Sequence, residues 1–355
     1  MGICKLPWGT KLFQGWWWLL WGCWLPCAPF LNPLTAAAPA LTRFAFTEPH
    51  MGTRYRIIIY AADELSAHRA VKNAFQRVAD LDDMMTDYRP TSELMRLCQK
   101  AGGPPVPVSQ DLFTVLAHAQ EVSRLSGGAF DVTVGPVVRL WRRARRTGEL
   151  PDPEQLARAQ ALVGYDKMRL DPKARTVQLT QPGMLLDLGG IAKGYAADAA
   201  LQVLRQQGIT SALVAASGDI AVMGAPPGTA GWKVGITPLE DENQKPSRYL
   251  LLKDAAVSTS GDAEQYVEIG GIRYSHILDP RTGKPLVGRS SVTVVAPHGL
   301  TADPLTKVVS VLGPERGFPI IEATSGAASL VTRQTAKGLE TVRSRRFTRY
   351  EVKKG

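Results

Sequence analysis

The chain has 355 residues, 45% of them hydrophobic, which indicates a globular protein with a large core and excludes an intrinsically disordered chain. Its formal net charge at pH 7 is +10, with 42 Lys and Arg against 32 Asp and Glu residues. The two dense basic runs, at 139–146 and 342–354, lack any nucleic-acid-binding motif, so we interpret them as solvated surface and predict no nucleic-acid partner.

The first forty residues differ in composition from the rest of the chain and resemble an export signal. Six of the eight tryptophans fall within the first 24 positions. The apolar run at 12–25, of about fourteen residues, is short for a membrane-spanning helix, and the small residues at 36–40 suit signal cleavage. The alternatives are an uncleaved membrane anchor and a lipid attached at Cys23 or Cys27.

Cysteine usage limits the chemistry of the remaining chain. Cys4, Cys23 and Cys27 belong to the leader, so its removal leaves Cys98 alone and excludes an internal disulfide in the mature protein. No second Cys or paired His spacing suggests a zinc site. We interpret Cys98 as a buried structural residue, with a catalytic thiol as the alternative.

Helices and short strands are predicted in the first half of the mature chain. After a strand at 54–60, apolar residues at three-to-four spacing indicate a helix over 64–85. A second helix is expected over 110–125, with Ser109 as its N-cap. Asp152-Pro153 announces a third helix, because Pro is favoured at the first helical position.

The second half of the chain reads mainly as strands. A hairpin at 167–181 and a strand at 184–190 precede a helix at 191–208. The segment 266–278 indicates a hairpin, because its Gly270-Gly271 pair fits a two-residue turn. Further strands are predicted at 212–217, 220–224, 232–236, 249–254, 291–297 and 328–333. Since strands often follow one another directly, the expected class is α+β, with largely antiparallel sheets and flanking helices.

The segment TADPLTKVVS (301–310) allows two interpretations of Asp303. Asp before Pro304 is the usual pairing at a helix start, and apolar residues at helical spacing follow until Gly313. The second interpretation is a metal site. Residues three and four apart share a helix face, so Asp303 and an oxygen side chain one turn later could hold one hard cation.

The strongest local pattern is DLGGIAKGYAAD (187–198), where two glycines and a lysine lie between a predicted strand and a helix. Such a turn presents backbone N–H groups to a phosphate, although it has neither Walker nor GxGxxG spacing. The alternative is a tight turn with a surface Lys193. Polar loops with glycines also occur at 126–136, with Asp131 and Thr133, at 217–220, at 258–266, and at 274–285, with His276, Asp279 and Arg281.

The order of these motifs resembles the FAD:protein FMN transferases of the ApbE family, once described as thiamine-biosynthesis lipoproteins. The resemblance runs from about Met51 to about Val331 and rests on MGTRYRI, MTDYRPTSEL, GGAFDVTVGP, DLGGIAKGYAAD, SGDI, STSG, YSHILDPRTGKP and TADPLTKVVSVLG. It implies an ApbE-like flavin transferase domain over residues 45–345, which would use Mg²⁺ to activate the pyrophosphate of FAD. FMN would pass to a threonine hydroxyl of an exported acceptor, such as a subunit of a membrane electron-transport complex, with release of AMP. The enzyme would lie in the periplasm, either free or anchored to the inner membrane.

The resemblance also assigns residues to the site. Met51 and Tyr88 would line the flavin site, Ala129, Phe130 and Asp131 would contact FAD, Asp187 and Lys193 would hold the nucleotide, and His276 would lie near the diphosphate. The metal ligands would be the carbonyl of Gly190 and the side chains of Asp303 and Thr306. The sequence departs from the family's usual pattern at Lys307, where a threonine is expected four residues after the aspartate.

The chemistry leaves some roles open. His276 is the expected base for the incoming hydroxyl, with Asp279 as an alternative, because an imidazole titrates near neutral pH. Two alternatives to transfer remain, namely hydrolysis of FAD to FMN and AMP, and a flavin-binding protein that holds FAD without turnover. An ammonium at position 307 keeps the last alternative open, since it could repel Mg²⁺ or partly replace its charge.

Overall fold

The computed structural model describes residues 40–239, 245–246, 248–261 and 266–352, which belong to one compact unit that begins at Ala40. The predicted export signal therefore lies outside the described residues, except for Ala40 itself. None of the helices within these ranges has the length and apolarity that a membrane crossing requires.

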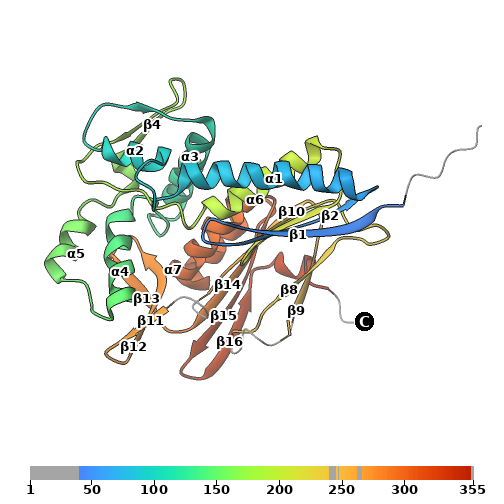
Figure 1. Ribbon diagram of the computed structural model, residues 1–355. Helices are drawn as coiled ribbons and strands as arrows, with labels where there is room; N and C mark the ends of the chain where they lie inside the picture. Colours follow the sequence, from blue (N-terminus) through green and yellow to red (C-terminus); the bar gives the residue numbers. More distant parts are fainter. Residues whose placement is uncertain (1–39, 240–244, 247, 262–265, 353–355) are drawn as a thin grey trace, which may run out of the picture. The chain divides into compact units, whose positions relative to one another are not determined.

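An eight-stranded antiparallel sheet forms the centre of the unit, in the order β1-β2-β6-β7-β10-β14-β15-β16 (Figure 1). The strands are β1 Thr42–His50, β2 Thr53–Ala61, β6 Ala212–Ala216, β7 Asp219–Met223, β10 Ala255–Gly261, β14 Ser290–Ala296, β15 Ala328–Thr335 and β16 Gly338–Arg343. The first two strands join strands from far along the chain, since Ile57 of β2 lies opposite Val214 of β6. The predicted α+β class with antiparallel sheets is confirmed.

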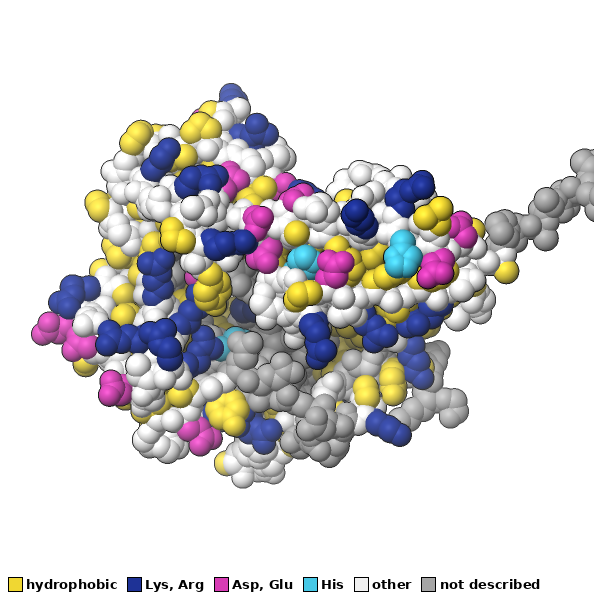
Figure 2. All heavy atoms as spheres, in the orientation of Figure 1, with side chains coloured by type: hydrophobic (Ala, Val, Ile, Leu, Met, Phe, Trp, Pro, Cys, Tyr) yellow, Lys and Arg dark blue, Asp and Glu magenta, His cyan; other side chains and the backbone are white. Residues whose placement is uncertain are grey.

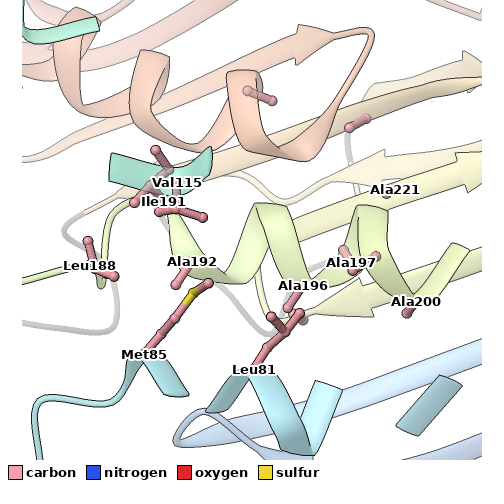
Figure 3. Packing of buried hydrophobic residues seen from close by; sticks show 14 of the residues in the cluster. Leu81, Met85, Val115, Leu188, Ile191, Ala192, Ala196, Ala197, Ala200 and Ala221 are labelled. Carbon is pink, nitrogen blue, oxygen red and sulfur yellow. The ribbon is translucent and has the colours of Figure 1, made fainter. Parts of the chain in front are cut away.

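Three long helices, α1 (Glu64–Met85), α6 (Ala192–Gln206) and α7 (Gly299–Ala323), pack against this sheet and one another. Figure 3 shows Leu81 and Met85 of α1 pointing toward Ala196 and Ala192 of α6. A second apolar cluster joins the sheet to the hairpin of β8 (Trp232–Ile236) and β9 (Arg248–Leu252). Small side chains on α6 let the helices approach closely, so the last turn of α1 and the first turn of α7 both lie against the first turn of α6.

Helices α6 and α7 cross at two glycines. A Cβ atom on Gly194 would lie 2.2 Å from the carbonyl oxygen of Gly299, and one on Gly299 would lie 2.4 Å from that of Gly194. No side chain fits at either position, so the close approach of the two backbones requires glycine. The crossing places Asp303, one turn after Gly299, beside the start of α6.

Two three-stranded sheets and the shorter helices complete the unit. The sheet β3-β5-β4 consists of β3 Val106–Pro107, β4 Met168–Asp171 and β5 Thr176–Leu179, and its neighbours include α2 (Glu93–Gln99) and α3 (Gln110–Leu125). The sheet β11-β12-β13 consists of β11 Tyr266–Ile269, β12 Ile272–Asp279 and β13 Lys284–Val287, and it packs against α4 (Gly135–Thr147) and α5 (Pro153–Gln160). Single 3-10 turns lie at Tyr165–Lys167 and Phe347–Arg349.

Local signals predicted several element boundaries correctly. The helices expected over 64–85 and 110–125 are α1 and α3, and the hydroxyl of Ser109 accepts the N–H of Leu112 as an N-cap. Gly270 and Gly271 have φ values of 58° and 74°, which is the left-handed pair that a two-residue hairpin turn needs.

The strand predicted at 184–190 is wrong. Apart from an isolated bridge between Leu185 and Val134, this segment is irregular. Its backbone pairs with other partners instead: the N–H of Asp187 donates to the carbonyl of Val132 at 2.8 Å, and that of Leu186 donates to Cys98 Sγ. The buried Cys98 is therefore structural, and burial raises the pKa of its thiol to about 11.

The prediction that Asp303 caps a helix is also wrong. Helix α7 begins at Gly299 and continues past a kink at Gly313, whose φ is 72°, to Ala323. Its first N–H groups, on Gly299 and Leu300, donate to the carboxylate of Asp198 at 2.8 and 2.9 Å. Because the cap comes from α6, the helix starts one turn earlier and Asp303 lies inside it.

Candidate active site

A cavity of about 850 Å³ lies where the polar loops predicted from the sequence meet. Its volume is within the range of small-molecule and cofactor sites. Nine of the predicted site residues line it, namely Met51, Tyr88, Ala129, Phe130, Asp131, Asp187, Gly190, Lys193 and His276. Asp303 and Thr306 do not line the cavity, and each is 0% exposed.

Lys193 and Asp219 form an ion pair in the cavity wall. Lys193 lies in the first turn of α6, and its Nζ is 2.7 Å from a carboxylate oxygen of Asp219, the first residue of β7. The hydroxyl of Ser258 donates to the other carboxylate oxygen. Burial would lower the pKa of Lys193, but the carboxylates of Asp219 and Asp303 raise it. Burial would raise the pKa of Asp219, but Lys193 and Lys307 lower it, so this pair is charged at neutral pH.

Met51 is held at the cavity in a conformation that is unusual for a side-chain-bearing residue. Its φ is 49°, and its N–H donates to the carboxylate of Asp82 at 2.8 Å. The hydroxyl of Tyr55 donates to the Met51 sulfur at 3.1 Å, and burial raises the pKa of that hydroxyl. A left-handed residue of this kind persists only where the surrounding contacts hold it, and such residues cluster at functional sites.

Arg142 connects the glycine turn to the Tyr88 side of the cavity. Asp187 accepts the N–H of Gly189 at 2.8 Å, which closes the turn, and its other oxygen lies 2.6 Å from Arg142. Arg142 also pairs with Asp87, and its guanidinium carbon is 4.8 Å from the centre of the Tyr88 ring. Burial raises the pKa of Asp187, whereas Arg142 opposes that shift. The ring of Tyr88, though largely exposed, is thus placed by a cation–π contact.

Asp131 stabilises the loop that contains it. One of its carboxylate oxygens accepts the N–H of Thr133 at 2.8 Å and the hydroxyl of Thr133 at 2.7 Å. That hydroxyl also accepts the N–H of Gly164, and burial raises the pKa of Asp131. Because Thr133 is fully buried and does not line the cavity, its function is to fix the loop that presents Ala129 and Phe130.

Asp303 binds Lys307 and the start of α6. One carboxylate oxygen bonds to Nζ of Lys307, one turn later in α7, and the other accepts the N–H of Gly194 at 3.3 Å. The side chain of Lys307 is 17% exposed and lines the cavity, whereas that of Asp303 is 0% exposed and does not. Asp303 therefore influences the cavity by positioning the Lys307 ammonium.

The other oxygen atoms expected to bind a metal are also engaged within the protein. The Thr306 hydroxyl donates to the backbone carbonyl of Asp303 at 2.6 Å and lies 2.7 Å from Ser260 Oγ. A Cβ on Gly190 would lie 3.4 Å from Cε of Lys307, so this side chain passes the turn that was expected to supply a carbonyl ligand. No three His, Cys, Asp or Glu side chains of the described ranges gather as a metal centre. In this arrangement the residues do not fit Mg²⁺, because an ammonium occupies the position beside Asp303.

The two candidate bases, His276 and Asp279, differ in their access to the cavity. His276 lies in β12 and lines the cavity. Asp279, at the end of the same strand, does not line it, and its carboxylate binds the guanidinium of Arg281 at 2.8 and 2.9 Å. Because both carboxylate oxygens of Asp279 bind Arg281, His276 is the better placed of the two to accept a proton from a group in the cavity.

Sequence reasoning missed Arg142, Arg145 and Asp87, all of which line the cavity. The sequence of the basic run 139–146 predicts solvated surface, and Figure 2 shows Lys and Arg side chains gathered where α4 lies in Figure 1. The amphipathic pattern of α4 could have revealed the difference. Its Trp141 and Ala144 are buried, and Arg142 and Arg145 are only partly exposed, unlike Arg143.

The arrangement suits a ligand that carries both a ring system and a diphosphate. Apolar and aromatic side chains line part of the cavity, while two ammonium groups, two guanidinium groups and a glycine turn supply positive charge and backbone donors. Such groups can bind a diphosphate and stabilise the negative charge that develops on it during phosphoryl transfer.

Comparison with known sequences indicates one family. The ApbE family model matches residues 51–331. An FAD:protein FMN transferase from Vibrio cholerae is 32% identical over 304 residues, which cover 84% of this chain and 90% of that protein. One from Treponema pallidum is 33% identical over 295 residues, which cover 79% of this chain and 82% of that protein.

Solved structures support the same relationship. The flavin transferase ApbE from Vibrio cholerae superposes with a TM-score of 0.78 at 32% identity, over 87% of this chain and 99% of that chain. The ApbE protein from Thermotoga maritima gives a TM-score of 0.78 at 28% identity, over 88% of this chain and 100% of that chain. The expected ApbE-like flavin transferase fold is confirmed.

Proposed function

Because the chain belongs to the ApbE family and is an FAD:protein FMN transferase, we propose that it transfers FMN from FAD to a threonine hydroxyl of an acceptor protein and releases AMP. The observation that carries this proposal is the cavity. The glycine turn at 189–190 lines this cavity together with Lys193, Lys307 and Arg142. His276 lines the same cavity. These are the groups that binding and cleavage of a dinucleotide diphosphate require.

In the proposed reaction, the threonine Oγ attacks the phosphorus atom that carries the riboflavin. A P–O bond forms to the threonine, and the bond from this phosphorus to the bridging oxygen of the diphosphate breaks. AMP leaves with the bridging oxygen. The hydroxyl proton passes to His276 and then to solvent, while Lys193 and Lys307 stabilise the negative charge on the leaving phosphate.

Magnesium dependence is predicted by the resemblance alone, and the contacts of the expected ligands do not support it. Since Asp303 and Thr306 are engaged within the protein and Lys307 fills the place beside Asp303, we assign no step of the reaction to a metal. Met51, Tyr88, Ala129, Phe130 and Asp131 are proposed to hold the flavin part of FAD, for which their position in the cavity wall is the support.

We further propose that the enzyme acts outside the cytoplasm, in the periplasm, on an exported acceptor such as a subunit of a membrane electron-transport complex. The support is the composition of the first forty residues, which suits an export signal or a membrane anchor. Cell fractionation, with mass spectrometry of the mature N-terminus, separates cleavage, lipidation and retention of the segment. Recovery of the full-length chain in the cytosol would contradict export.

The test of the function combines purified mature protein, FAD, Mg²⁺ and an acceptor with a flavinylation threonine. We expect a fluorescent flavin band on the acceptor, an equal amount of AMP, and loss of both with His276→Asn. A matched acceptor with alanine for that threonine should stay unlabelled. AMP without a labelled acceptor favours hydrolysis, and FAD binding with neither product favours a non-catalytic flavoprotein.

A further inference from the structure

We propose that the Lys307 ammonium is the resident cation of the diphosphate site, in the position where the family resemblance predicts a metal ion. The inference rests on the proposed use of FAD and assigns to Lys307 the neutralisation of the diphosphate. The residues expected to bind the metal make other contacts in the structure.

The charge that faces the cavity at this position is that of Lys307. Asp303 is 0% exposed and does not line the cavity, whereas Lys307 lines it and bonds to the Asp303 carboxylate. A bound anion would therefore meet the ammonium, not the carboxylate. Asp303 orients Lys307 in the same way that Asp219 orients Lys193 at 2.7 Å, so the cavity wall carries two lysines that are each held by a buried carboxylate.

The side-chain oxygen atoms expected to bind a metal are already engaged within the protein. The second oxygen of Asp303 accepts the N–H of Gly194, and the Thr306 hydroxyl is shared between the Asp303 carbonyl and Ser260. The aliphatic part of Lys307 passes Gly190, to within 3.4 Å of where a Cβ atom would stand there. A metal at Asp303 would have to displace Lys307 into the cavity, where the two positive charges would repel each other.

Phosphoryl transfer needs positive charge at the atoms where negative charge grows, and a lysine supplies it as a point charge with three donors. An ammonium that the fold already fixes needs no metal uptake to do so. Transfer should therefore proceed without a divalent cation, and replacing Lys307 by threonine should create the oxygen ligand that the family pattern expects.

The experiment compares wild type, Lys307→Thr and the matched control Lys337→Thr, which removes an exposed lysine in the β15–β16 turn. Isothermal titration with MgCl₂ alone, without FAD, measures metal uptake. FMN transfer to the acceptor is then measured in excess EDTA and in Mg²⁺. Thermal unfolding shows that each variant is folded, and Lys307→Gln replaces Lys307→Thr if the latter is not.

We expect no Mg²⁺ uptake and EDTA-resistant transfer for wild type and Lys337→Thr. In EDTA, Lys307→Thr should lose about 10²- to 10³-fold in transfer rate, the effect of removing one donor from a developing charge. Uptake of one Mg²⁺ by wild type, loss of wild-type transfer in EDTA, or wild-type rates for Lys307→Thr in EDTA would each overturn the proposal. If no protein transfers FMN under any condition, the proposed function fails. The titration then still shows whether the ammonium or a metal ion occupies this position. Mg²⁺ uptake by wild type contradicts the proposal, and uptake confined to Lys307→Thr supports it.

Discussion

Replacing Asp303 by alanine tests the buried ion pair. If Asp303 capped a helix, the substitution would lower the free energy of unfolding by about 1 kcal/mol. The structure predicts a larger loss, because alanine leaves the Lys307 ammonium and the N–H of Gly194 without their acceptor. Removing one partner of a buried ion pair costs about 3–5 kcal/mol. Since Lys307 is 17% exposed and can turn toward cavity water, we expect a loss at the lower end, about 3 kcal/mol.

Urea unfolding at neutral pH, followed by circular dichroism, measures this loss. In a double-mutant cycle with Lys307→Met, the double variant lacks both charges and should be more stable than the sum of the single effects by about 1 kcal/mol or more. Asp198→Ala is the matched comparison, since Asp198 caps α7 through Gly299 and Leu300 and should cost about 0.5–2 kcal/mol. The ion-pair reasoning is refuted if Asp303→Ala costs no more than Asp198→Ala and the cycle is additive.

Three further predictions concern the crossing and the two polar groups of the cavity. Gly194→Ala should lower the unfolding free energy by about 3 kcal/mol, because its Cβ would meet backbone at 2.2 Å; a wild-type urea midpoint would contradict that close approach. Arg142→Met leaves Asp187 without its guanidinium and should weaken FAD binding about 10- to 100-fold in a fluorescence titration, in line with about 1.5–3 kcal/mol for a hydrogen bond to a charged group. Arg146→Met, which removes an exposed charge from the same helix, is its control, and equal affinities of the two variants would exclude the role of Arg142. Asp219→Asn tests the pH dependence of stability. In the folded protein the pKa of Asp219 is lowered below 3.8, so its carboxylate stabilises the folded state above that pH. This contribution is lost as the pH falls through the folded pKa. The stability difference from wild type should hold at neutral pH and shrink below about pH 4, and a difference that is unchanged in acid would show that the carboxylate charge is not its source.

Signals that act within a few residues made the fold largely predictable. Ser109 caps α3 through a hydrogen bond three residues away, and Gly270-Gly271 supplies the positive φ values of its turn. Both predictions are confirmed because the partner groups are close in the sequence. Asp303-Pro304 carries an equally good local signal for a helix start. It failed because Asp198, more than one hundred residues earlier, caps α7 and extends it backward.

The strand expected at 184–190 failed for a similar reason. Its apolar residues Met184, Leu186 and Leu188 are buried, but within the described residues its strand-type pairing is limited to the isolated bridge between Leu185 and Val134. The N–H of Asp187 donates to the carbonyl of Val132, in the loop that contains Ala129, Phe130 and Asp131. Burial can be read from a pattern of apolar residues, whereas the partner of a backbone group depends on the whole topology.

The charged residues of the candidate site were also only partly predictable from the sequence. The motifs named nine residues that do line one cavity, yet they could not show that Asp303 is withdrawn from it. One signal was available: Asp303 and Lys307 are four residues apart, with the acid on the N-terminal side, which is the favoured order for a helical ion pair. On an exposed helix such a pair contributes only about 0.3–0.5 kcal/mol and has little bearing on function. Here Asp303 is 0% exposed and Lys307 lines the cavity, so the same spacing determines which charge meets the substrate.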